Sequence, residues 1–138
     1  MVMVYGADSI EALYDEEKRI NFIKCHTSFN SNEFREGLMQ AYRFALEHKV
    51  KQWLLDLRDI GELNEEDNTW IQLHLFPMMM MTLGPSNYMA IVCSKSCYKN
   101  LLKAVGKLGL KTYNSFVILN TFCDLEKAEH WLGKKLAK

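Results

Sequence analysis

Three short segments of the chain are continuously apolar in character, and they limit the folds that it can adopt. They span residues 53–57, 89–93 and 116–119, and none of them alternates between apolar and polar residues. Runs of this kind are typical of β-strands that are covered on both faces, as in parallel sheets. About 30 residues separate one run from the next, which is enough for a helical crossover. We therefore expect the runs at 52–57, 88–93 and 116–120 to be parallel neighbours in one sheet.

The rest of the chain has hairpin and helical patterns. Two extended runs, 10–14 and 19–26, flank a polar turn and predict a β-hairpin. Apolar residues at helical spacing, preceded by capping side chains at 30–32, predict a helix over 32–48. Further helices are expected over 64–82, over 97–108 with a stop at Gly109, and from 125 to the C-terminus. The predicted fold class is α/β, with a mixed, mainly parallel sheet edged by the first hairpin strand.

This order of elements resembles the STAS domain, the fold of the SpoIIAA-like anti-sigma-factor antagonists, and in particular its small stand-alone bacterial members. The resemblance covers about residues 10–136 of a single domain, and three segments carry it: YDEEKRI at 14–20, NEFREGL at 32–38 and VKQWLLDLRD at 50–59. It implies a SpoIIAA-like fold and a non-enzymatic role in regulation through protein–protein contacts. The SEC14-type lipid-binding folds share some of this topology and are the alternative.

One motif of that family is missing from the chain. The antagonists carry a phosphorylatable Ser or Thr in a short motif after the central strand, whereas residues 59–64 read DIGELN here. The next hydroxyl is that of Thr69, inside the expected helix, and acidic side chains at 62 and 65–67 would repel a phosphate there. We therefore expect a partner-binding role without a kinase-controlled switch in this loop.

The charge balance and the cysteine content exclude several classes of protein. Seventeen basic residues match 17 acidic ones, so no basic excess is present to neutralise the phosphates of a nucleic acid. No apolar run reaches the roughly 18 residues of a membrane-spanning helix, and the N-terminus does not resemble a secretory signal. These features predict a cytoplasmic protein without membrane insertion. In a reducing cytoplasm the four cysteines are expected to be free thiols.

Two polar groups are candidates for a site. Arg58 with Asp56 and Asp59 follows a central strand, where ligands of open α/β sheets bind. Either the three form a local ion pair, or Arg58 and Asp59 recognise a polar ligand or a partner. Cys93 and Cys97, at a strand end and a helix start, permit a role as a redox sensor. A structural zinc site is not indicated, because it needs four ligands, usually in closely spaced pairs. Without a catalytic signature we expect no enzyme activity, metal or cofactor, although an enzyme using the strand-end polar residues remains an alternative.

The stretch 70–83, most of which belongs to the expected helix over 64–82, is apolar nearly all round, which one covering sheet cannot explain. Pro77 is expected to kink the helix or to end its first half. Four consecutive methionines at 78–81 would form a soft apolar surface. A helical arrangement places residues on two apolar faces: Trp70, Ile71, His74, Met78 and Met81 on one, and Leu73, Phe76 and Met80 on the other. A second subunit, a small apolar ligand or a neighbouring helix could cover them, and we expect a homodimer that uses this helix as its main interaction surface.

Overall fold

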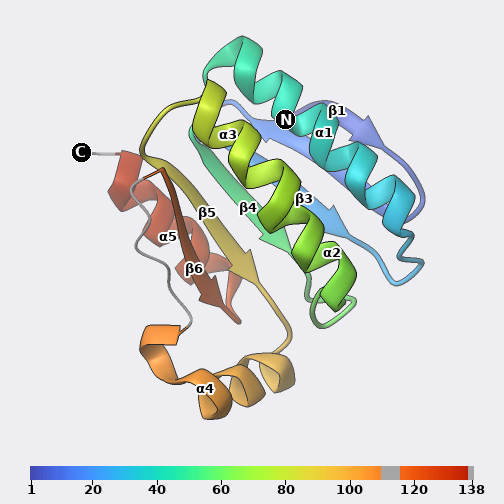
Figure 1. Ribbon diagram of the computed structural model, residues 1–138, viewed down its shortest axis with the longest axis vertical. Helices are drawn as coiled ribbons and strands as arrows, with labels where there is room; N and C mark the ends of the chain where they lie inside the picture. The colour runs from blue at the N-terminus through green and yellow to red at the C-terminus, as the bar shows by residue number, and fades with distance from the viewer. Residues whose placement is uncertain (110–115, 137–138) are drawn as a thin grey trace.

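Six strands form one mixed sheet in which the spatial order of the strands follows the sequence (Figure 1). A computed structural model describes residues 1–109 and 116–136, and the side chains of 1–103 and 116–135. The first strand pairs antiparallel with the second and the second with the third, whereas the third to the sixth are parallel. The strands are β1 (Val2–Gly6), β2 (Ile10–Asp15), β3 (Ile20–Cys25), β4 (Gln52–Asp56), β5 (Asn87–Val92) and β6 (Val117–Phe122).

The three apolar runs lie side by side as β4, β5 and β6. They are parallel, with Trp53 opposite Met89 and Met89 opposite Leu119, which confirms the predicted arrangement. Every residue of β4 is buried, as expected for a strand with protein on both faces. The α/β class and the mixed, mainly parallel sheet are confirmed with them.

The predicted hairpin is also present, but it does not form the edge of the sheet. β2 and β3 pair antiparallel, with Ile10 opposite Cys25, and β1 pairs with the outer side of β2. The prediction that the first hairpin strand is the edge was therefore wrong. β1 is a short edge strand with a register shift between Met3 and Tyr5, and its first residues are exposed. It thus lacks the continuous apolar pattern that identifies a central strand.

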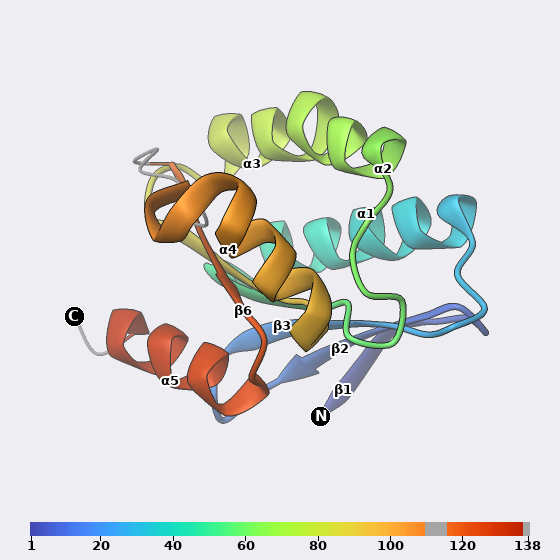
Figure 2. The same ribbon diagram turned by 90° about the horizontal axis from the view of Figure 1, so that it is seen from below.

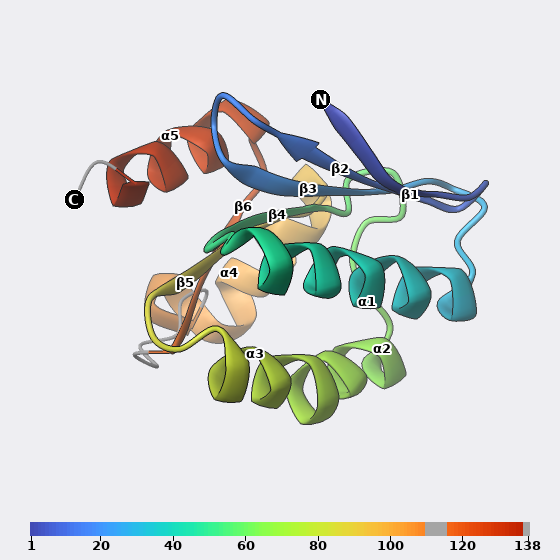
Figure 3. The same cartoon turned by 90° about the horizontal axis from the view of Figure 1, so that it is seen from above.

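Helices cover both faces of the sheet, and each face has its own core (Figures 2 and 3). The helices are α1 (Ser31–His48), α2 (Glu65–Trp70), the π-helical η1 (Ile71–Leu75), α3 (Phe76–Thr82), α4 (Lys95–Gly109) and α5 (Leu125–Leu136). α1 packs on β1 to β3, whereas α5 packs on the opposite face against β4 to β6. Side chains alternate between the two cores along a strand: Leu55 faces the α1 side, and Leu54 faces α5. None of the helices that the structure describes is long and apolar enough to cross a membrane.

The helix starts follow the capping side chains. Asn30 accepts a hydrogen bond from the backbone N–H of Glu33 at the start of α1, and Asn64 does the same for Asp67 at the start of α2. α4 begins two residues before the predicted 97, because the Ser94 hydroxyl caps its first turn. α5 begins at the predicted residue 125, while residues 137–138 of the expected helix lie outside the described part of the chain.

Asp67 joins α1 to α2 and so places the following helix over the sheet. Its carboxylate is fully buried and accepts hydrogen bonds from the Ser31 hydroxyl (2.7 Å), from Arg35 Nε (3.1 Å) and from Asn64 Nδ2 (2.9 Å). A buried carboxylate is tolerated only when it is paired in this way. The acidic first turn of α2 therefore contains one structural anchor among solvent-exposed neighbours.

α2, η1 and α3 form one continuous helix over 65–82, which we call the long helix (Figure 1). In η1 the N–H of Phe76 reaches back five residues to the carbonyl of Ile71. Pro77 follows in the first turn of α3. Proline has no N–H and clashes with the carbonyl four residues earlier in a regular α-helix, and the wider π turn relieves both problems. The helix therefore continues through Pro77 instead of ending before it.

Candidate functional site: a cavity beneath the long helix

A cavity of about 370 Å³ lies between the sheet, the long helix and α4. Its floor is the sheet surface of Leu55, Met89 and Ile91, which belong to the neighbouring interior strands β4 and β5. The long helix forms one wall with Ile71 and Phe76. The remaining apolar contacts come from the strand ends, the loop before α2, β6 and α4, through Leu57, Leu63, Cys93, Leu119 and Leu101.

The position of α4 explains why this part of the sheet is open. α1 covers β1 to β3, and the long helix lies beside it on the same face (Figure 3). α4 lies beyond the carboxyl ends of β5 and β6 and does not cover the centre of these strands (Figure 1). Ile91 is consequently only half-buried although it sits in a central strand. The cavity thus occupies the region between the middle of the strands and their carboxyl ends, where α/β proteins bind ligands.

Four polar side chains interrupt the apolar lining: Glu62, Asn68, Gln72 and Thr121. Asn68 and Gln72 are one helical turn apart on the long helix, and Thr121 is in β6. None of the four side chains forms a hydrogen bond or an ion pair with another residue that the structure describes. They can therefore offer their oxygen and amide groups to a ligand.

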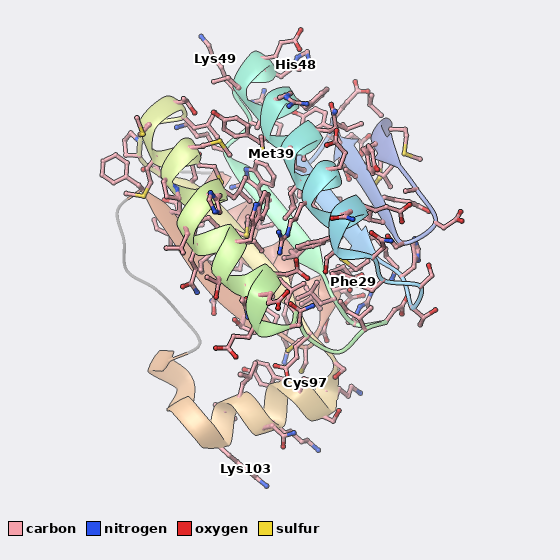
Figure 4. All side chains as sticks on the ribbon, turned by 45° about the vertical axis from the view of Figure 1, so that its right-hand side comes forward. Phe29, Met39, His48, Lys49, Cys97 and Lys103 are labelled. Atoms are coloured by element: carbon pink, nitrogen blue, oxygen red, sulfur yellow. The ribbon has the colours of Figure 1, made fainter. Side chains whose placement is uncertain are left out.

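Gly61 explains the placement of Glu62. It adopts a φ of +89°, in the left-handed region that favours glycine, and the turn brings Glu62 to the cavity. A Cβ at this position would lie 3.2 Å from the sulfur of Cys97, so the turn packs closely on the start of α4. Figure 4 shows Cys97 at the end of α4 that adjoins the rest of the molecule. The loop before the long helix and α4 together therefore define one end of the cavity.

The predicted group around Arg58 is a local ion pair outside this cavity. Arg58 Nε and Nη2 donate to the two carboxylate oxygens of Asp56 at 2.9 and 2.8 Å, and Lys24 Nζ lies 3.3 Å from the same carboxylate. Burial of Asp56 would raise its pKa, but the hydrogen bonds from Arg58 and the charge of Lys24 outweigh this effect and lower it. Asp59 lies 3.5 Å from Lys24 Nζ and joins the same cluster. The charged groups of this cluster are therefore already paired with one another.

The methionine-rich helix does not present the predicted set of residues on one face. The buried apolar side chains of the long helix are Ile71, Leu75 and Met79, whereas Met81 is 86% exposed and His74 is also exposed. The π turn takes one more residue than an α turn, so residues after it are rotated relative to those before it. The five residues predicted to share a face are thus separated into buried, half-buried and exposed positions, with Trp70 and Met78 half-buried.

Two of the predicted residues, Trp70 before the π turn and His74 within it, do remain together. The rings of Trp70 and His74 lie 6.2 Å apart, and the Arg35 guanidinium lies over the Trp70 ring, 5.6 Å from its centre. Arg35 belongs to α1, so Trp70 packs towards that helix. Leu73, which is 66% exposed, and Met81 are the large apolar side chains that the long helix exposes to solvent. A prediction based on regular α-helical periodicity could not identify which of these side chains are buried and which are exposed, because it does not include the π turn.

The cysteines are free thiols, as expected, and one of them lines the cavity. Cys93 is buried, and burial raises the pKa of its thiol to about 11, with smaller contributions from Cys97 and Cys123. It therefore stays protonated at neutral pH, and its sulfur lies 3.5 Å from the carbonyl oxygen of Phe122. Within 1–109 and 116–136, no three His, Cys, Asp or Glu side chains are grouped so that they could hold a metal ion.

The polar lining of the cavity was not predicted from the sequence. Asn68 and Gln72 are polar residues four positions apart, so a helix places them on one face, and this spacing was the signal available in the sequence. Glu62 was counted only among the acidic residues of the loop. Family models, curated proteins and solved structures were compared with the chain, and none of them matches it. Its function must therefore be argued from the geometry of the cavity.

Proposed function

We propose that the protein binds a small, mainly apolar ligand in the cavity beneath the long helix, as a carrier or sensor and without catalysis. The observation that carries this proposal is the cavity itself: about 370 Å³ with an apolar floor and a few polar groups at its sides. Ligand sites in proteins typically have this composition and begin at about 300 Å³. Liquid water occupies about 30 Å³ per molecule, so the ligand has roughly a dozen non-hydrogen atoms.

The methionines of the long helix support a binding role. Met78 and Met80 are half-buried and pack against the larger of the two cores, next to the fully buried Met79. These methionines do not line the cavity, but unbranched thioether side chains change shape easily, so the core behind the cavity wall can adjust to an occupant. The π turn in the cavity wall also supports a binding role, because π turns are frequent at functional sites.

A regulatory protein–protein module of the STAS type is the second candidate. Two observations favour it: the chain has the element order on which the resemblance rests, and Leu73 and Met81 are exposed on the outer face of the long helix. A homodimer through this face would cover both side chains, since a twofold interface uses the same patch twice. The two candidates are compatible, because the cavity lies beneath the helix and the apolar patch lies on its outer surface.

The ligand proposal is tested by titrating the protein with phenylbutanol, a probe of about the right size, in a calorimeter. Ile91→Trp places a larger side chain on the cavity floor and is expected to weaken binding at least tenfold. Ile118→Trp is the matched control, because Ile118 lies on the neighbouring strand with its side chain on the α5 face. Absence of binding to the unmodified protein, or equal affinities of the two variants, would contradict the proposal.

A further inference from the structure

We propose that the ligand of this cavity is an apolar amine, whose ammonium group pairs with Glu62 while its apolar body lies on the sheet. This inference rests on the proposed function and adds the chemical class of the ligand. Among the described residues that line the cavity, Glu62 is the only one that carries a charge. Its exposed carboxylate has no hydrogen-bond or ion-pair partner among the residues that the structure describes. The site therefore has an acceptor available for a cation.

The neutral polar groups of the lining suit the same ligand. Asn68 and Gln72 provide amide oxygens and Thr121 provides a hydroxyl oxygen, and each of these atoms accepts hydrogen bonds. An ammonium group has three N–H donors and no acceptor, so it can use Glu62 and one of these oxygens at once. The carboxylate of a fatty acid would instead need donors, and it would meet the negative charge of Glu62.

Neighbouring residues add negative charge at the end of the cavity where Glu62 lies. Glu65 and Glu66 are exposed in the first turn of the long helix, close in sequence to Glu62. Two cations on other elements are paired with carboxylates of their own, Arg58 with Asp56 and Arg35 with Asp67. Lys95 and Lys99 in the first turns of α4 are exposed to solvent and do not line the cavity. On α4, Lys103 points away from the rest of the molecule (Figure 4). At the start of that helix, the Ser94 hydroxyl already accepts from the N–H of Cys97.

The geometry also avoids the burial of a charge. Glu62 is exposed, whereas Leu55 and Met89 at the floor are almost completely buried. A ligand that extends from Glu62 to the cavity floor keeps its ammonium group near water and its apolar body in the cavity. Charged groups that remain partly hydrated avoid most of the desolvation penalty. The contribution of the pair to affinity is that of an exposed ion pair, a factor of about three.

Three probes with the same apolar body test the inference: phenylbutylamine, phenylbutanol and phenylbutyrate. Their affinities are measured by calorimetry at pH 7 and low ionic strength. We expect the amine to bind about threefold tighter than the alcohol and about tenfold tighter than the acid. Glu62→Gln should reduce the preference of the site for the amine over the alcohol to about one, while Glu65→Gln, outside the lining, should largely preserve it. Higher salt should weaken the preference as well.

The outcomes separate this inference from the proposed function. If none of the three probes binds, both are wrong. If the alcohol binds but the acid binds as tightly as the amine, the cavity is a ligand site and the assignment to amines is wrong. The same conclusion follows if Glu62→Gln leaves the preference for the amine unchanged. Glu62 is exposed, and its carboxylate forms no hydrogen bond or ion pair with a described residue, so the melting temperature of Glu62→Gln should match that of the unmodified protein.

Discussion

Asp56→Asn removes a fully buried carboxylate while it keeps the size of the side chain. The structure assigns the group around Asp56 to stability, because the carboxylate accepts two hydrogen bonds from the Arg58 side chain and lies 3.3 Å from Lys24 Nζ. If this assignment is correct, the substitution must lower the free energy of unfolding at neutral pH. It should leave ligand binding unchanged, since Asp56 and Arg58 do not line the cavity.

The size of the effect follows from the contacts. A hydrogen bond to a charged group contributes about 1.5–3 kcal/mol, but the Arg58 side chain is 39% exposed, so solvent screens part of this interaction. We therefore expect Asp56→Asn to lower the free energy of unfolding by about 2 kcal/mol. With a urea dependence of roughly 1.5 kcal/mol per molar, the midpoint of unfolding falls by about 1.3 M. Asp59→Asn, at a half-exposed neighbour, should cost less than about 1 kcal/mol.

The pH dependence gives an independent check. The pKa of Asp56 is lower in the folded protein than the usual 3.8, so the unfolded chain takes up its proton first as the pH falls. The stabilisation is fully present above about pH 5 and is lost as the pH drops through the unfolded and then the folded pKa. The difference between the unmodified protein and Asp56→Asn should therefore shrink towards pH 3.

Urea unfolding followed by circular dichroism at pH 7, 5 and 3 measures these quantities. A difference below about 0.5 kcal/mol at pH 7 would refute the assignment of the pair to stability. A difference as large at pH 3 as at pH 7 would refute the account of the lowered pKa. In the first case, Arg58 and Asp59 would again be candidates for recognition of a ligand or partner.

Three further predictions concern other parts of the molecule. Asp67→Ala should lower the melting temperature by roughly 10 °C through the loss of about 3 kcal/mol, whereas Glu66→Ala should change it little; equal shifts in a thermal scan would contradict the anchoring role. Iodoacetamide at pH 8 should modify Cys97 well before Cys93, as mapped by mass spectrometry, because Cys93 is buried and has a pKa of about 11. Met81→Lys should reduce the sedimenting mass from dimer to monomer with unchanged circular dichroism; an unchanged mass would exclude this face as the dimer contact.

The central sheet was predictable from the sequence because local and tertiary requirements coincide there. Leu54 and Leu55 point to opposite faces, and both are buried, so no polar residue interrupts the apolar run in the middle of the strand, between Gln52 and Asp56. Asn30 and Asn64 were predictable as caps because a cap acts within its own turn of helix. The edge strand β1 was missed because Val2 and Met3 face solvent and bury too little to impose a pattern.

The candidate site depended on features that a local pattern does not contain. The π turn rotates the residues after it relative to those before it, and the spacing of apolar residues does not show where such a turn occurs. The burial of Asp67 depends on Arg35, which is 32 residues away. The cavity exists because α4 lies beyond the ends of the strands, and apolar periodicity alone does not determine where a helix docks.

The position of a bound probe tests the central claim, that the cavity beneath the long helix is a ligand site, most directly. Methyl-resolved proton–carbon correlation spectra of the protein are recorded during a titration with phenylbutylamine. The account predicts saturable shifts at Leu55, Met89 and Ile91 on the cavity floor, with Leu73 and Met81 on the outer helix face unchanged. Shifts confined to Leu73 and Met81, or no saturable shift at the cavity floor, would contradict it.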